Sequence, residues 1–320
     1  MTPVVIARYI DFHSHFYEPG WFSSSATIGH GILARAWPLL TDIEVQLAAM
    51  DEANIDAKVL SAPPALLAEP GKQLPVSLIE RINDRFAELV LTYPERLLAV
   101  ATVDAFQGEL AAREVVRAIE DLGLGGICVD CANGDRFLDA PEARPTFEVA
   151  TRLGVCVFVH PVSPAGLTER LSRLGHTGTL LARGTENAAS LLALLRSSIF
   201  DELPDLKIVL PMIGAGVFLF AGVAEQDYGR EEGWQGASPR ILRKRLYVDT
   251  MGFDPATISF AVDLLGAEHV LAGSDWPIMP ITSRQHIDKV LAELELSEQQ
   301  TAAIIGGNTA RLLKSPVTNA

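Results

Sequence analysis

Short apolar runs alternate with longer stretches of mixed polar and apolar residues along almost the whole chain. Stretches such as 41–54 and 75–94 repeat their apolar residues with the spacing of a helix, and Thr41 and Glu44 have the spacing of a capping box. The short runs predict eight buried strands, at residues 5–12, 57–60, 97–103, 126–129, 155–159, 207–210, 246–248 and 270–272. Strands that alternate with helices are typical of repeated βα units and a parallel sheet.

The number of predicted strands separates two architectures for this α/β chain. Eight strands with intervening helices match a (β/α)8 TIM-like barrel. The alternative is an open, doubly wound sheet, in which a glycine-rich phosphate-binding loop follows the first strand. No glycine-rich loop follows the first predicted strand here, so the sequence favours the barrel.

No linker, internal repeat or low-complexity tract divides the chain, and we expect residues 1–320 to form a single barrel domain with loop insertions. Residues 17–37, rich in Ser, Gly and aromatic residues, predict a long loop after the first strand. Residues 162–185 predict a similar extension after the fifth strand. Active sites of barrels lie on the face formed by these loops, so we expect both insertions to help cover a substrate.

Composition and charge argue against several kinds of partner. The 320 residues carry 26 Lys and Arg against 40 Asp and Glu, and a net charge of −14 repels nucleic acid and anionic membranes. No apolar run reaches the roughly 18 residues needed to cross a bilayer, and no cationic segment followed by an apolar core opens the chain. The three cysteines lie in or beside apolar runs without the spacing of a disulfide framework. We therefore expect a cytoplasmic protein with core thiols that acts on a small molecule.

The first strand ends in "IDFHSH", which has two histidines one residue apart. On a regular strand the side chains at i and i+2 point the same way, so we expect His13 and His15 to project together while Phe12 and Ser14 face elsewhere. A divalent cation is one partner that satisfies two buried imidazoles. Two hydrogen-bonded core histidines are the alternative, and this motif alone does not separate the two.

Two further polar residues follow predicted strands. His160 ends the apolar run of "GVCVFVHP", and Asp275 follows the last strand in "HVLAGSDWP". Alone, a histidine at a strand end is more often a hydrogen-bonded structural residue, and an aspartate there is commonly a helix cap. In a barrel, however, residues that follow strands one, five and eight meet on one face. Four such side chains together indicate a functional site.

The segments "IDFHSHF", "LGVCVFVHP", "SSIFDELPDLKIVL", "VLAGSDWP" and "IIGGNTARLL" together resemble the amidohydrolase superfamily, in the branch of aminocarboxymuconate-semialdehyde decarboxylase and related aromatic-acid decarboxylases. The resemblance covers almost the whole chain. It implies a TIM-like barrel of the metal-dependent hydrolase type that binds one divalent metal ion, usually zinc and sometimes manganese. It also suggests a homodimer or a larger homo-oligomer.

The resemblance carries roles to particular residues. It implies that His13, His15 and His160 are metal ligands, and that Asp275 is a ligand or a proton-handling carboxylate. The fourth strand, "GGICVD", lacks the lysine that bridges two metals in binuclear relatives. One metal ion is therefore expected.

One position departs from the family pattern. The family usually reads "KIVLAHGGG" after the sixth strand, whereas this chain reads "KIVLPMIGAG" and has Met212 in place of the histidine. Methionine is not a general base and is a poor ligand for zinc, so Met212 is a candidate for contact with the substrate. Proton transfer would then fall to Asp275 and another residue. His176 is the candidate replacement, and a solvated surface histidine is the alternative.

Two more side chains are candidates for substrate binding. Arg183, in "LLARGTEN", can pair with a substrate carboxylate through its planar guanidinium, although a surface charge beside a helix is the alternative. Trp276, next to Asp275, forms either an aromatic wall of the pocket or part of the core.

Three reactions or roles stay open at this point. The resemblance implies nonoxidative decarboxylation of a small aromatic or unsaturated carboxylic acid. A protein-bound metal also lowers the pKa of a bound water from about 15.7 to near 7, so that the same site can hydrolyse an ester, lactone or amide. The replacement at Met212 favours this hydrolysis or another variant reaction. The third hypothesis is a noncatalytic barrel that acts as a binding module.

Overall fold

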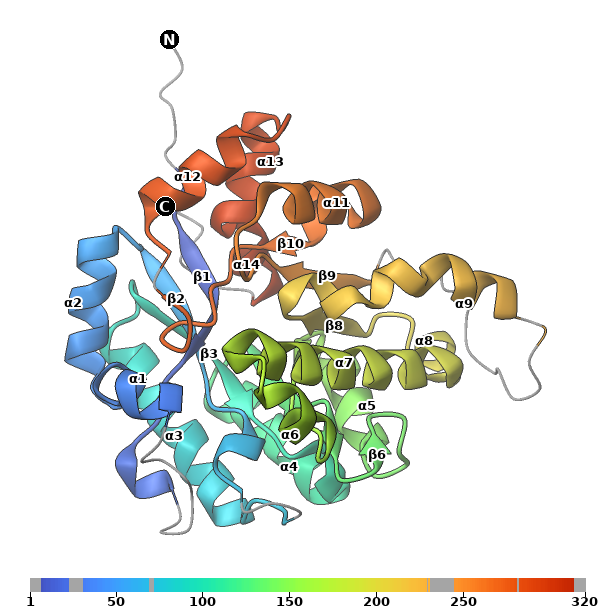
Figure 1. Ribbon diagram of the computed structural model, residues 1–320. Helices are drawn as coiled ribbons and strands as arrows, with labels where there is room; N and C mark the ends of the chain where they lie inside the picture. The colour runs from blue at the N-terminus through green and yellow to red at the C-terminus, as the bar shows by residue number, and fades with distance from the viewer. Residues whose placement is uncertain are drawn as a thin grey trace.

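The computed structural model describes residues 7–22, 31–68, 72–228, 230, 245–280 and 282–313. Eight parallel strands lie in the order β1-β2-β3-β4-β7-β8-β9-β10 and are surrounded by helices (Figure 1). They are β1 (Ile10–His15), β2 (Ala57–Ser61), β3 (Leu97–Thr102), β4 (Gly126–Asp130), β7 (Cys156–His160), β8 (Lys207–Leu210), β9 (Leu246–Asp249) and β10 (Val270–Leu271). All eight overlap the apolar runs of the sequence, and the (β/α)8 barrel is confirmed.

Backbone hydrogen bonds between the first strand and the segment after the last close the sheet into a barrel. The Phe12 N–H donates to the Ala272 carbonyl over 2.8 Å, and the His15 N–H donates to the Trp276 carbonyl over 2.9 Å. In the other direction, the Asp275 N–H donates to the His13 carbonyl over 2.8 Å. Closure therefore holds Asp275 beside β1.

The remaining elements cover the outside and the ends of the barrel (Figure 1). The α-helices of the described residues are α1 (Gly31–Thr41), α2 (Ile43–Ala53), α3 (Val76–Thr92), α4 (Glu109–Val116), α5 (Arg144–Leu153), α6 (Leu167–Ser172), α7 (Gly175–Arg196), α8 (Ile199–Glu202), α9 (Ala221–Asp227), α11 (Pro255–Leu265), α12 (Arg284–Ala292), α13 (Glu298–Ala302) and α14 (Asn308–Leu312). A short antiparallel ribbon, β5 (Ala132–Asn133) with β6 (Arg136–Phe137), follows β4, and the helical turns of η5 (Met212–Phe220) follow β8. Among the helices described, none combines the length and the apolar composition that a bilayer-spanning segment needs.

Two apolar cores lie on the two faces of the sheet. Alternate strand residues, among them Phe12, Val59 and Phe158, form the smaller core inside the barrel. The larger core packs the outward-facing strand residues against the helices. All three cysteines are buried and free, as expected for core thiols.

The start of α2 differs from the capping box that the sequence predicted. The side chain of Asp42, and not that of Thr41, caps this helix by accepting the N–H groups of Glu44 and Val45. Thr41 instead ends α1, where its hydroxyl donates to the Trp37 carbonyl over 2.8 Å. Because aspartate caps a helix as well as threonine does, spacing alone could not choose between the two neighbours.

The two predicted loop insertions are partly helical. Residues 23–30 of the first lie outside the described residues, and α1 begins at Gly31. In the second, α6 and the first part of α7 occupy most of the segment that was expected to be a loop. Two glycines inside α7 permit close packing: a Cβ on Gly178 would lie 2.1 Å from the Leu171 carbonyl oxygen, and one on Gly184 would lie 3.0 Å from Cβ of Ala215.

Candidate metal centre

An irregularity in β1 sets the direction of its side chains. The pairing register of β1 with β2 shifts after Asp11. As a result, the consecutive residues Phe12 and His13 both contact the ring of Phe158, with centroid distances of 5.3 and 4.9 Å. The expectation that Phe12 faces away from His13 is therefore wrong, because an irregularity of this kind breaks the strict alternation of a strand.

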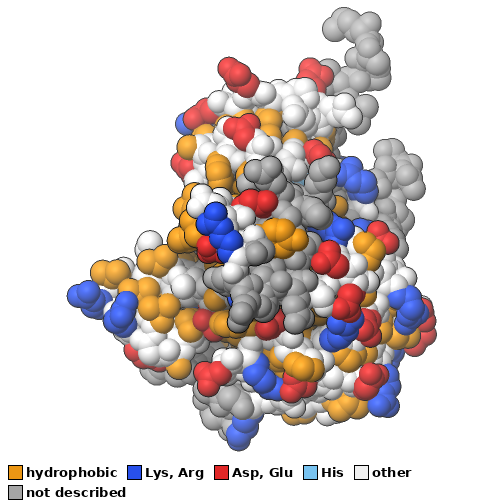
Figure 2. Space-filling model, turned by 90° about the vertical axis from the view of Figure 1, so that its right-hand side faces the viewer, with side chains coloured by type: hydrophobic (Ala, Val, Ile, Leu, Met, Phe, Trp, Pro, Cys, Tyr) orange, Lys and Arg blue, Asp and Glu red, His pale blue; other side chains and the backbone are white. Residues whose placement is uncertain are grey.

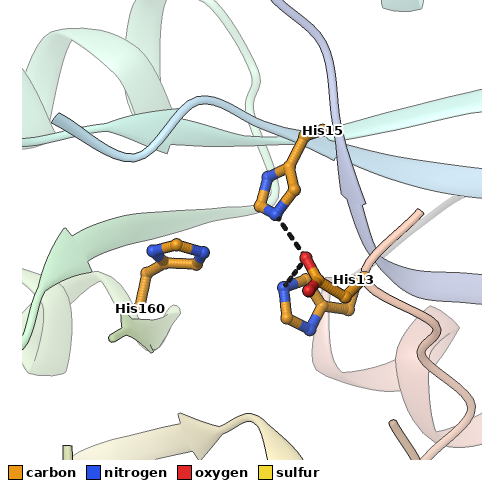
Figure 3. A group of neighbouring side chains, drawn as sticks. His13, His15 and His160 are labelled. Carbon is orange, nitrogen blue, oxygen red and sulfur yellow. Dashed lines mark hydrogen bonds and ion pairs between the residues drawn. The ribbon is translucent and has the colours of Figure 1, made fainter. Parts of the chain in front are cut away.

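Four buried side chains converge at the C-terminal end of the barrel strands. His13 and His15 come from β1, His160 from the end of β7, and Asp275 from the segment after β10. The potential ligand atoms, one from each residue, all lie within 4.8 Å of one another. Figure 3 shows the three imidazole rings around one space. The ring centroids of His13 and His160 lie 5.9 Å apart. The structure thus brings together the four residues that follow strands in the sequence.

Hydrogen bonds select the tautomers of two of these histidines. Nδ1 of His13 lies 2.6 Å from Oδ2 of Asp249, so a proton on Nδ1 leaves the Nε2 lone pair free. The Ser61 hydroxyl donates to the Ser14 carbonyl, which leaves its oxygen to accept the Nδ1 proton of His15 at 2.9 Å. Nε2 of His15 then also carries a free lone pair. Partners of this kind orient the histidines of metal sites.

The carboxylate of Asp275 points at the Nε2 atoms of His13 and His15. Its Oδ1 lies 3.0 Å from Nε2 of His15 and 3.4 Å from Nε2 of His13. Lone pairs that face one another at such distances repel unless a cation lies among them, and a divalent ion suits this mixed nitrogen and oxygen set. Asp275 has a φ of 63°, which is unusual for a residue with a side chain. The backbone is thus held in an unfavourable conformation where it presents this carboxylate.

Burial and neighbouring charges set the protonation of the cluster. Burial lowers the pKa of His15 and holds that of His160 well below its ordinary value, and the charge of Arg183 adds to the effect on His160. Burial acts against the shifts in the pKa of His13 and in the pKa of Asp275. The carboxylates around His13, with Asp275 first among them, together outweigh burial and raise the pKa of His13, and the charge of His13 in turn lowers the pKa of Asp275. The cluster therefore offers neutral imidazoles at His15 and His160 and an ionised carboxylate at Asp275, the forms that bind metals.

Two nitrogens of the cluster have no hydrogen-bond partner among the residues described. They are Nε2 of His13 and Nδ1 of His160, and both are buried. Leaving a buried polar atom without a partner costs about 1–3 kcal/mol. A cation among the four side chains would give the His13 nitrogen a partner. The donor set therefore fits a single divalent metal ion.

The family model for amidohydrolases matches residues 10–314, a range that includes all four converging side chains. The chain belongs to the amidohydrolase family. The gamma-resorcylate decarboxylase of Rhodococcus jostii (strain RHA1) is 30% identical to it, over 95% of this chain and 98% of that relative. The 2-amino-3-carboxymuconate-6-semialdehyde decarboxylase of Dictyostelium discoideum is 25% identical, over 95% of this chain and 91% of that relative.

A solved structure in the same family supports the comparison. The dihydroxybenzoic acid decarboxylase of Polaromonas sp. JS666, with bound manganese and the inhibitor 2-nitroresorcinol, has a TM-score of 0.81 to this amidohydrolase. The two are 26% identical, and the match covers 97% of each chain. The resemblance to the decarboxylase branch that the sequence motifs suggested is confirmed.

This amidohydrolase has a cavity of about 720 Å³ beside the cluster. The charged and imidazole side chains that line it are Lys72, Asp104, Asp130, Asp135, His160, Arg183 and Glu186. Arg183 is held in place by a hydrogen bond of 2.9 Å from Nη2 to the Pro161 carbonyl, and its buried Nε has no partner. The cavity therefore contains a fixed guanidinium with an unused donor close to His160.

Met212 occupies a strained turn behind the cluster. It has a φ of 53° and begins a run of left-handed residues in η5. Its N–H donates to Oδ1 of Asp249 over 2.8 Å, and its Cε lies 3.5 Å from the position of a Cβ on Gly184. Met212 thus packs between η5 and α7 and is not among the described residues that line the cavity.

Trp276 and His176 also lie away from the cavity wall. Trp276 is 3% exposed, and Nζ of Lys58 lies 3.6 Å from the centre of its ring. This agrees with the core-packing alternative for Trp276. His176 is exposed in the first turn of α7, and neither side chain is among the described residues that line the cavity.

Sequence reasoning missed the two residues that orient the histidines. Asp249 is the last residue of β9 and Ser61 is the last residue of β2, so both lie at the same edge of the barrel as the cluster. A polar residue that ends an apolar run is the same signal that pointed to His160. Applied to every predicted strand, it would have found both.

Proposed function

We propose that this amidohydrolase is a metal-dependent nonoxidative decarboxylase of a small aromatic carboxylic acid. The observation that carries the proposal is the convergence of His13, His15, His160 and Asp275 beside a cavity that His160 and Arg183 line. The relatives that match over nearly the whole chain are named as decarboxylases, which supports the same reaction here.

The four converging side chains would hold one divalent ion. Three imidazoles and a carboxylate suit zinc, which we propose as the resident metal, and manganese, bound in the Polaromonas relative, is the alternative. Such an ion would supply Lewis-acid polarisation of a substrate oxygen.

The chain's own residues would bind the substrate and move the proton. Arg183 binds the substrate carboxylate through its unpartnered Nε and the planar fork of the guanidinium. When the bond between the ring carbon and the carboxylate breaks, CO₂ leaves and the electron pair stays on the ring carbon. Asp275 relays a proton from solvent to that carbon, so that hydrogen replaces the carboxylate. Met212 cannot exchange a proton and His176 is exposed, so we assign this step to Asp275.

Release of CO₂ tests the proposed function directly. Protein loaded with zinc or manganese is incubated with hydroxybenzoates and, as substrates for a hydrolase, phenyl acetate and dihydrocoumarin. We expect CO₂ from at least one hydroxybenzoate, at a rate that Asp275→Asn abolishes and His176→Ala leaves unchanged. Ester or lactone cleavage without CO₂ would replace the decarboxylase with a hydrolase. Metal binding without any turnover would favour a noncatalytic binding module.

We also propose that two copies associate through the face formed by α7, η5 and α9. Leu219 and Phe220 of η5 are 74% and 66% exposed, and Val223 of α9 is 56% exposed. An apolar groove of about 310 Å³ runs between α7 and these elements. Figure 2 looks onto the side of the molecule that carries α9, and hydrophobic side chains gather on part of that face. Exposed apolar surface of this kind is typical of an interface.

Sedimentation equilibrium tests this homodimer. We expect Phe220→Asp to convert a dimer into a monomer. Leu91→Asp is the matched control, because Leu91 of α3 is 80% exposed and lies on a different helix. A monomeric unmodified protein, or a dimer that Phe220→Asp does not affect, would contradict the proposed interface.

We propose the cytoplasm as the location of the protein. The three cysteines are free and buried, and structures without disulfides are typical of reducing compartments. Fractionation of cells that express the tagged chain tests this location, and recovery with periplasmic or secreted material would contradict it.

A further inference from the structure

Lys58 of β2 is a buried lysine that the proposed reaction does not use. It is 1% exposed, and its Nζ has no hydrogen-bond partner among the residues described. Its neighbours Ala57 and Val59 belong to the core inside the barrel. Because side chains alternate along a strand, Lys58 points to the outer face of the barrel wall. Lysine is almost never fully buried without a partner, so this position needs an explanation.

The aromatic ring of Trp276 supplies that partner. Nζ of Lys58 lies 3.6 Å from the centre of the ring. Burial holds the pKa of Lys58 well below its ordinary value. An ammonium and a neutral amine, however, both have N–H groups that interact favourably with the face of an aromatic ring. Trp276 is itself buried, so the amine and the ring fix each other inside the protein.

Trp276 directly follows the carboxylate of the candidate metal centre. Its carbonyl accepts the N–H of His15 over 2.9 Å, and the N–H of Asp275 donates to the His13 carbonyl over 2.8 Å. Between these two bonds Asp275 has a φ of 63°. A residue with a side chain keeps such a conformation when its surroundings hold it there. The direction of the Asp275 carboxylate therefore depends on how firmly its neighbours are fixed.

Asp11 and Lys58 act on the two sides of Asp275. They are register partners on β1 and β2. Asp11 accepts the N–H of Ser274 over 3.0 Å and also its hydroxyl. The Ser274 Oγ in turn accepts the N–H of Trp276 over 3.2 Å. Asp11 thus holds the residue before Asp275, and Lys58 packs on the ring of the residue after it.

We infer that Lys58 is a positioning residue of the metal centre: its amine fixes the Trp276 ring and thereby holds the Asp275 carboxylate toward the histidines of β1. The inference rests on the metal centre of the proposed function. An apolar side chain of similar size avoids the cost of burying an amine. A lysine that served the fold alone would therefore be replaceable without loss of stability. The effect on Asp275 explains why an amine lies here.

The affinity for zinc, measured without substrate by competition with a chromophoric chelator, tests the inference. Lys58→Met keeps the length and the apolar stem of the side chain but removes the amine. We expect it to bind zinc about tenfold more weakly than the unmodified protein. The free energy of unfolding of the metal-free variant in urea should be unchanged or higher. This combination separates positioning from support of the fold, which would lower the free energy of unfolding.

A double-mutant cycle tests whether the effect of Lys58 passes through the ring. Trp276→Leu should weaken zinc binding by a similar factor, and the addition of Lys58→Met to this variant should weaken it no further. Trp276→Phe keeps an aromatic face for the amine and should retain most of the affinity.

Two variants of α12 control for charge and for stability. Lys289→Met removes a positive charge from an exposed position and should leave the affinity for zinc unchanged. Leu291→Ala, on the buried face of the same helix, should lower the free energy of unfolding without weakening zinc binding.

The outcomes distinguish this inference from the proposed reaction. Unchanged zinc affinity in Lys58→Met, or the same effect of Lys58→Met with and without the Trp276 ring, would contradict the role of Lys58. Weaker zinc binding together with a lower free energy of unfolding would assign Lys58 to the fold and overturn the inference. Zinc binding that depends on Lys58, without CO₂ release from any hydroxybenzoate, would contradict the proposed reaction and leave the role of Lys58 standing.

Discussion

The carboxylate of Asp249 lies 2.6 Å from Nδ1 of His13, and both side chains are buried. Asp249 also accepts the backbone N–H groups of Met212 and Met251. One residue at the end of β9 therefore orients a histidine of the cluster and holds the turn after β8. A substitution of Asp249 therefore affects the orientation of His13 in the candidate metal site without removing a candidate ligand.

Asp249→Ala should weaken metal binding about 10–100-fold, because His13 loses the partner that fixes its tautomer and direction. The affinity for zinc is measured by competition with a chromophoric chelator. Asp263→Ala, at an exposed position on α11, is the control and should bind zinc as the unmodified protein does. Equal affinity in the Asp249 variant would show that the hydrogen bond does not support the site.

Removal of a ligand should empty the site. Elemental analysis of protein purified without added metal should find about one zinc or manganese per chain, and none in folded His13→Ala or His160→Ala. His286→Ala, on the exposed side of α12, should keep the metal. Failure of the unmodified protein to retain either metal after loading would contradict the metal mechanism.

Arg183→Gln should raise KM for an aromatic acid at least about tenfold, because the substrate carboxylate loses a charged, two-pronged partner. Arg183→Lys should recover part of the loss, since the charge returns without the planar fork. Arg173→Gln removes an exposed arginine between α6 and α7 and serves as the control. Initial rates over a range of substrate concentrations give KM, and an unchanged KM in Arg183→Gln would exclude the assigned role.

Asp11 should make stability depend on pH. Burial raises the pKa of Asp11 to about 6, although the side chain accepts hydrogen bonds from Ser274. The folded protein then keeps a proton that the unfolded chain loses at about pH 4, so unfolding becomes easier as the pH rises from about 4 to 6. The difference between the pKa values of Asp11 in the folded and the unfolded protein corresponds to a loss of roughly 3 kcal/mol in the free energy of unfolding at neutral pH.

The side chain of Asp11→Asn does not titrate, so this variant should not lose stability through this group as the pH rises. Urea unfolding of the metal-free proteins measures the free energy of unfolding of the variant and of the unmodified protein. The variant's value minus that of the unmodified protein should increase by up to about 3 kcal/mol between pH 4 and 7. Asp263→Asn is the control for a general change in charge. Parallel pH profiles for the Asp11 variant and the unmodified protein would refute the prediction.

Gly178→Ala should destabilise the contact between α6 and α7. The added Cβ would lie 2.1 Å from the Leu171 carbonyl oxygen, so a backbone must move, at a cost of about 1–3 kcal/mol in unfolding free energy. Gly222→Ala in α9 is the matched control, because no atom lies within 4 Å of its new Cβ and alanine favours a helix. Urea unfolding compares the two variants, and similar effects would argue against close packing at Gly178.

Much of the fold could be predicted from the order of residues. A strand of a parallel barrel is buried on both faces and reads as a continuous apolar run, so the runs at 57–60, 97–103 and 207–210 marked strands within a residue. Helical boundaries depend on which neighbour supplies a cap, and there the choice of Thr41 over Asp42 was wrong. The expectation of a loop at 162–185 was largely wrong, because α6 and the first part of α7 occupy most of the segment and Gly178 and Gly184 permit close approach there.

The sequence by itself determined that polar residues follow the first, fifth and eighth apolar runs, and barrel geometry then brings His13, His15, His160 and Asp275 to one face. Only the tertiary structure decided how they are used. The partner of His13 is Asp249, 236 residues away in the chain, and the irregularity in β1 depends on pairing with β2. Contacts of this kind depend on register and closure of the whole barrel, which no local pattern contains.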